Sequence, residues 1–160
     1  MDDVSNHHLK RDRASLTIDK FSAAQEQLDE SIGAFFRNKW LAAITLAGAT
    51  EYMLPVASPE SDLFEIGKKK IRHLIGMTES EFIDLMNKQR DWLKHVQMQK
   101  PVVLEYSQDD VVIMILRAYL RLRSLTDAES EPMLNFRFWV EQNIDSKETF
   151  SFDQLRGGNQ

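Results

Sequence analysis

The sequence predicts an all-α protein, folded as an up-down bundle of about five to six helices. Apolar residues recur at the three- and four-residue spacing of helices along most of the chain. Capping residues precede several of these segments, and Val102-Val103-Leu104 has no second strand pattern to pair with. At 160 residues the chain has the length of one domain. We therefore expect a flexible tail over 1–15, a single helical domain over 16–145 and a second flexible tail over 146–160.

The first two helices are expected to begin near Thr17 and Trp40. Thr17 is a suitable N-cap, with Leu16 and Phe21 placed to form a hydrophobic staple. The second helix ends at Pro55 and is rich in small residues, which let neighbouring helices approach closely. We therefore expect the second helix near the centre of the bundle. The first helix should bury one stripe, formed by Phe21, Ala24, Leu28, Ile32, Phe35 and Phe36.

Two further helices are predicted in the middle of the chain. Ser58 as N-cap and Pro59 at the first helical position open a third helix, which ends at Gly76. Thr78-Glu79-Ser80-Glu81 forms a capping box that fixes the start of a fourth helix, and Pro101 lies just beyond its end. Val102-Val103-Leu104 is then expected to be a buried connector.

The last two helices follow this connector. Ser107-Gln108-Asp109-Asp110 caps a fifth helix, and its Arg117 and Arg121 are four residues apart and expected on the outer face. The final helix should run from about Pro132 to Asn143. The apolar positions expected inside are Val111, Val112, Ile115, Leu116, Tyr119, Leu122, Leu125, Met133, Phe136, Trp139 and Val140.

Charge and composition restrict the function classes. A net charge of −5 argues against a broad nucleic-acid-binding surface. The stretch from Lys68 to Lys100, however, contains eight basic and four acidic residues. Its local charge of +4 could guide a phosphate. An ordinary solvated face explains this strip equally well. The chain has no cysteine and no apolar stretch long enough to span a bilayer, so we expect a soluble cytoplasmic protein without membrane contact.

Several kinds of chemical site are absent from the sequence. There is no glycine-rich phosphate loop, no His-Glu-x-x-His zinc pattern and no Gly-x-Ser-x-Gly nucleophile elbow. Glu26, Asp29 and Glu30 lie on one helix, but without a Glu-x-x-His motif they indicate a solvated face rather than a metal site. His7-His8 lies in the predicted tail and is a poor metal site for that reason. No metal or other cofactor is expected.

One stretch combines a histidine, an arginine and a carboxylate inside a predicted helix, namely Arg90, Asp91 and His95. Histidine can transfer a proton near neutral pH, and arginine can bind a phosphate through two parallel hydrogen bonds. Without a metal, such a pair could direct an RNA 2′-hydroxyl against its neighbouring phosphate. Asp91 could orient the imidazole. Positions five apart on a helix are turned by about 140°, so the pair would converge better if a second copy of the helix contributed.

Arg90, Asp91, Lys94 and His95 together resemble the R-x4-6-H motif of the HEPN superfamily, in which a polar residue usually follows the arginine. Ala24-x2-Gln27-Leu28-Asp29, the segment 45–51 and Leu93-Lys94-His95 also resemble a bacterial HEPN-like group. The resemblance spans roughly residues 16 to 143.

This resemblance implies a helical bundle that forms a homodimer and acts as a metal-independent endoribonuclease, with a 2′,3′-cyclic phosphate as product. Arg90, Asp91 and His95 would be the catalytic residues, and we expect Lys88 and Lys94 to bind the RNA substrate. Many such RNases are toxins with an antitoxin protein as partner. Other HEPN-like proteins lack catalysis, so the alternative is a non-catalytic helical dimer that binds a protein or a small ligand.

Overall fold

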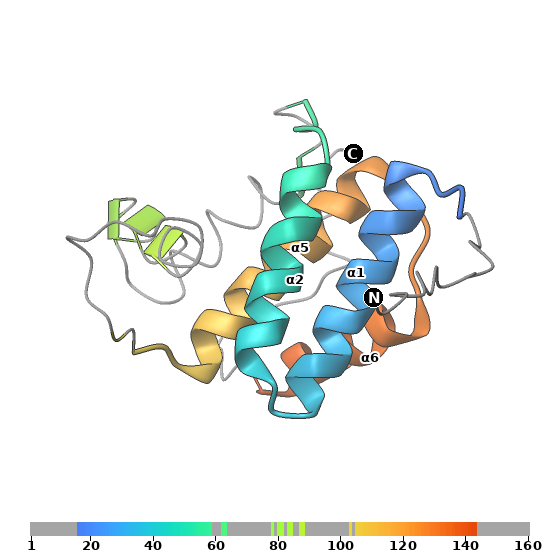
Figure 1. The fold of residues 1–160 in the computed structure, drawn as a ribbon. Helices are drawn as coiled ribbons and strands as arrows, with labels where there is room; N and C mark the ends of the chain where they lie inside the picture. The colour runs from blue at the N-terminus through green and yellow to red at the C-terminus, as the bar shows by residue number, and fades with distance from the viewer. Residues whose placement is uncertain are drawn as a thin grey trace, which may run out of the picture.

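The computed structural model describes residues 16–58, 62–63, 78, 80–81, 83–84, 87–88, 103 and 105–143. Four helices run through this part of the chain and are labelled as in Figure 1: α1 (Lys20–Phe36), α2 (Trp40–Met53), α5 (Gln108–Leu125) and α6 (Glu131–Asn143). No strand occurs among the described residues, so the all-α prediction is confirmed for them. Both expected tails and most of the third helix lie outside the described residues.

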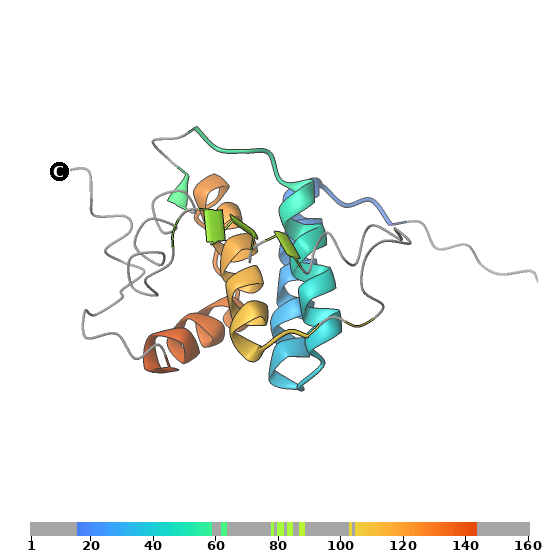
Figure 2. The same ribbon diagram turned by 90° about the vertical axis from the view of Figure 1, so that its left-hand side faces the viewer.

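The four helices form two layers. α1 and α2 are joined by a short turn and lie side by side as an antiparallel hairpin (Figure 1). α5 packs against both helices of this hairpin, and α6 packs against α1. Figure 2 shows α5 running alongside the hairpin. In the same view α6 is inclined to α5, near the lower end of α5. Within the described ranges, no helix combines the length and apolarity that a membrane crossing requires.

The first helix begins later than the sequence predicted. Asp19, not Thr17, is its N-cap, because the Asp19 carboxylate accepts hydrogen bonds from the backbone N–H groups of Phe21 and Ser22. Leu16 is 81% exposed, so the expected hydrophobic staple is wrong. A carboxylate that accepts two N–H groups at once satisfies the helix end without a staple.

The turn between α1 and α2 depends on one left-handed residue. Asn38 has a φ of 56°, a conformation that asparagine adopts more readily than most residues. Its N–H donates to the carbonyl of Phe35 at 3.0 Å, and the N–H of Lys39 donates to that of Ala34 at 2.8 Å. These two bonds form a Schellman motif, which ends α1 and turns the chain into α2.

The helix at the centre of the described part is α5, not α2. Ten of the residues of α5 are buried, whereas five of those in α2 are. A capping box between Ser107 and Asp110 starts α5 as predicted. α2 leaves Leu41, Ala42 and Thr45 exposed on the side away from α5. Among the described helices, α2 is therefore less buried than α5, because its described neighbours cover only part of its surface.

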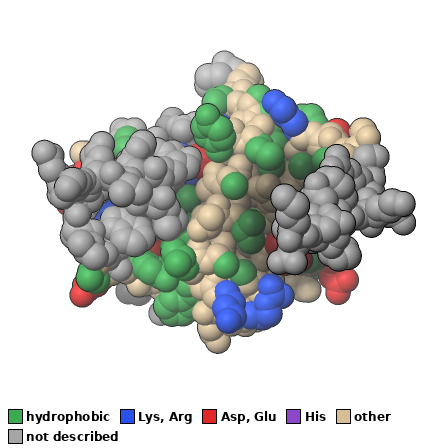
Figure 3. Space-filling view, in the orientation of Figure 1, with side chains coloured by type: hydrophobic (Ala, Val, Ile, Leu, Met, Phe, Trp, Pro, Cys, Tyr) green, Lys and Arg blue, Asp and Glu red, His purple; other side chains and the backbone are tan. Residues whose placement is uncertain are grey.

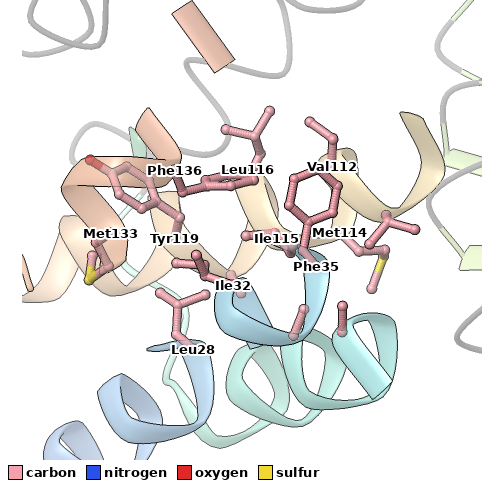
Figure 4. Packing of buried hydrophobic residues seen from close by; sticks show 14 of the residues in the cluster. Leu28, Ile32, Phe35, Val112, Met114, Ile115, Leu116, Tyr119, Met133 and Phe136 are labelled. Carbon is pink, nitrogen blue, oxygen red and sulfur yellow. The ribbon is translucent and has the colours of Figure 1, made fainter. Parts of the chain in front are cut away.

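The hydrophobic core lies between the two layers. Figure 4 shows Leu28, Ile32 and Phe35 of α1 meeting Ile115 and Tyr119 of α5 and residues of α6. At the α6 end, Phe136 stacks on Trp139 with ring centroids 6.4 Å apart and meets Phe35 edge-on at 5.8 Å. Of the four positions predicted inside α6, Met133, Phe136 and Val140 are buried, and Trp139 is partly buried against the core. Val103 is 75% exposed, so the predicted buried connector is wrong at that residue.

Candidate functional site

The predicted catalytic residues Arg90, Asp91 and His95 lie outside the described residues, as does Lys94. Lys88 is described: its backbone is helical and its side chain is exposed. Exposure leaves the Lys88 ammonium accessible to a ligand from solvent. The expected binding role of Lys88 stays a prediction, because the partner residues are not described.

The start of the helix that leads to these residues is described and confirms the capping box. The Thr78 N–H donates to Glu81 Oε2 at 2.8 Å, and the Glu81 N–H donates to Thr78 Oγ1 at 3.3 Å. The hydrogen bonds from Thr78 lower the pKa of the Glu81 carboxyl. The described positions from 80 to 88 are helical, and Ile83, Asp84 and Lys88 among them are exposed. The register of this helix is therefore set from Thr78 onward.

A second set of polar residues lies along α5 and corrects the expectation for its arginines. Arg117 is not on an outer face: its Nε lies 2.5 Å from Glu51 Oε1 of α2, and the two side chains are only 13% and 10% exposed. Glu51 is the one charged residue in α2. A largely buried charge pair of this kind fixes the register of two helices, because breaking it leaves one buried charge behind.

Arg121 lies one turn further along α5 and is buried as well. Its Nη2 lies 3.9 Å from Oδ2 of Asp62, whose side chain is 1% exposed. Beside this pair, the Leu63 N–H donates to Ser124 Oγ at 2.8 Å, and Ser124 donates to the Leu120 carbonyl. We call Arg117, Arg121 and Ser124, with Glu51, Asp62 and Leu63 as their partners, the α5 polar seam.

The α5 polar seam is suited to positioning rather than to chemistry. Its cations face carboxylates, so they are already neutralised, and no histidine lies among its members to activate a nucleophile. Its one hydroxyl, Ser124 Oγ, donates to the Leu120 carbonyl and accepts from the Leu63 N–H. The seam instead anchors residues 62 and 63 on α5. Because the chain continues from there to Thr78, the seam fixes where the segment with the predicted site departs from the described helices.

A third polar cluster joins α5 to α6. Glu129 accepts a hydrogen bond from the Tyr119 hydroxyl and lies 3.6 Å from Arg137 and 3.9 Å from Arg123. Burial raises the pKa of Tyr119, and the hydrogen bond to Glu129 raises it further. A tyrosine whose phenol stays neutral in this way is a hydrogen-bond donor, not a base. The cluster therefore holds the α5–α6 connection in place.

The three acidic residues of α1 do not form a metal site. Glu26 and Glu30 are exposed, as expected for a solvated face, but Asp29 accepts a hydrogen bond of 2.5 Å from Ser130 Oγ at the start of α6. Burial raises the pKa of Asp29. In the part of the chain that the structure describes, no group of three or more His, Cys, Asp or Glu side chains could hold a metal ion.

Sequence reasoning missed the α5 polar seam, although one signal pointed to it. Glu51 is the only charge in a helix that is otherwise uncharged, and such a residue usually meets a cation on a neighbouring element. The spacing of Arg117, Arg121 and Ser124 places all three on one face of α5, but spacing alone does not show whether that face is buried.

Comparisons with protein-family models, with curated proteins and with solved structures found no match to this chain.

Proposed function

We propose that this chain is a HEPN-like helical protein that works as a homodimer and cleaves RNA without a metal ion, with Arg90, Asp91 and His95 as its catalytic residues. The observation that carries the proposal is the capping box at Thr78 and Glu81. If the helix continues from this start through residue 95, as the sequence predicts, Asp91 and His95 share one face, because they are four residues apart. That spacing lets a carboxylate orient an imidazole.

The proposed reaction uses the RNA itself as nucleophile. His95 accepts the proton of a 2′-hydroxyl as the 2′-oxygen bonds to the adjacent phosphorus. Arg90 stabilises the negative charge that develops on the phosphate oxygens. The bond from phosphorus to the 5′-oxygen then breaks, and this oxygen leaves as a hydroxyl after taking a proton from water. The hydroxide that remains takes the proton that His95 accepted, so His95 is neutral again. The products are a 2′,3′-cyclic phosphate and a 5′-hydroxyl end, and Lys88 and Lys94 would bind the flanking phosphates.

The test is incubation of the purified protein with mixed RNA in EDTA. The wild-type protein should cleave RNA and leave 2′,3′-cyclic phosphate ends, whereas DNA, which has no 2′-hydroxyl, should survive. His95→Ala removes the proton carrier and should lower the rate about a hundredfold or more. Arg90→Ala should lower it to a similar extent.

The matched control is His8→Ala, which removes a histidine from the predicted tail and should leave the rate unchanged. Cleavage that survives His95→Ala would contradict the assigned catalytic residues. Cleavage that EDTA abolishes would contradict the metal-independent mechanism. No cleavage by the wild-type protein would contradict the RNase function itself.

A second candidate function is a non-catalytic helical dimer that binds a protein or a small ligand. One observation favours it: the described helices expose uncharged apolar surface on α2, where a partner could pack. In this function Arg90 and His95 need not lie in one cleft. Neither Arg90→Ala nor His95→Ala would then remove an activity. An antitoxin partner belongs to the first function only.

A further inference from the structure

We draw no further inference here: the strongest candidate, the uncharged face of α2 around Leu41, Ala42 and Thr45, is exposed along the helix (Figure 3), and nothing in the described part of the structure shows what covers it.

Discussion

Asn38 is the residue on which the α1–α2 hairpin depends. With a φ of 56°, it lets two N–H groups reach back to the end of α1. Because the hairpin provides both the packing face for α5 and the open face of α2, this single conformation affects the core and the surface together.

Substitutions at Asn38 should separate backbone strain from side-chain loss. Asn38→Val should lower the free energy of unfolding by about 1–2 kcal/mol, because a β-branched residue is strained in the left-handed region. Asn38→Gly should lie within about 0.5 kcal/mol of the wild type, because glycine adopts this region without strain. Urea denaturation measures both values. Equal stability of the two variants would show that the turn does not impose this conformation.

At the scale of the elements, polar contacts join helices that the sequence shows only separately. The Arg117–Glu51 pair joins α5 to α2, and the Ser130–Asp29 hydrogen bond joins α6 to α1. The Arg117–Glu51 pair is largely shielded from water, and the Ser130–Asp29 hydrogen bond is partly buried. Their strength can therefore be tested by comparison with an exposed pair in the same chain.

A double-mutant cycle should show that the Arg117–Glu51 pair matters for stability. Glu51→Gln leaves the buried guanidinium without this carboxylate and should cost about 3 kcal/mol. Replacing both residues, as Glu51→Leu with Arg117→Met, should cost less than the sum of the single substitutions, because neither charge of this pair is left buried without the other. The control pair is Glu30 and Arg37, which are 3.7 Å apart with side chains 69% and 63% exposed. Glu30→Gln should cost less than about 0.5 kcal/mol. Similar costs for Glu51→Gln and Glu30→Gln would contradict the buried contact.

The Asp29 contact should appear as a pH dependence. Burial raises the pKa of Asp29 above its ordinary value of 3.8, so the folded protein holds the Asp29 proton more tightly than the unfolded chain. The resulting stability is present below the ordinary pKa and is lost as pH rises through the raised pKa. Asp29→Asn can still accept the Ser130 hydrogen bond but does not titrate.

The measurement compares wild type and Asp29→Asn by urea denaturation at several pH values from below 3.8 upward. The stability of the wild type relative to the variant should fall with rising pH over this window and then level off. A relative stability that stays constant or rises would mean that the carboxyl is not held in a buried contact.

At the scale of the whole molecule, dimerisation and RNA cleavage together decide between the two proposed functions. A dimer that cleaves RNA in EDTA supports the RNase function. A dimer without cleavage supports the non-catalytic binding module. The net charge of −5 makes a broad RNA-binding surface unfavourable, so any cleavage should depend on a local site and weaken as salt concentration rises.

The sequence by itself determined the class of fold and most of the local boundaries in the described residues. The capping boxes at Ser107 and Thr78 and the positions of α5 and α6 agree with prediction, because caps and helical periodicity depend on residues only a few positions apart. The sequence also singled out Arg90, Asp91 and His95, which lie outside the described residues.

Only the tertiary structure decided which faces of the helices meet. α2 has apolar residues on every side and Glu51 as its one charge, so its periodicity could not show that one face stays exposed or that α5 is more deeply buried. Arg117 and Arg121 have the spacing of solvent-exposed residues, yet they are largely buried. Each forms an ion pair with a carboxylate that is distant in the sequence, Glu51 for Arg117 and Asp62 for Arg121. Long-range partners of this kind set burial and charge pairing, and a local pattern carries no information about them.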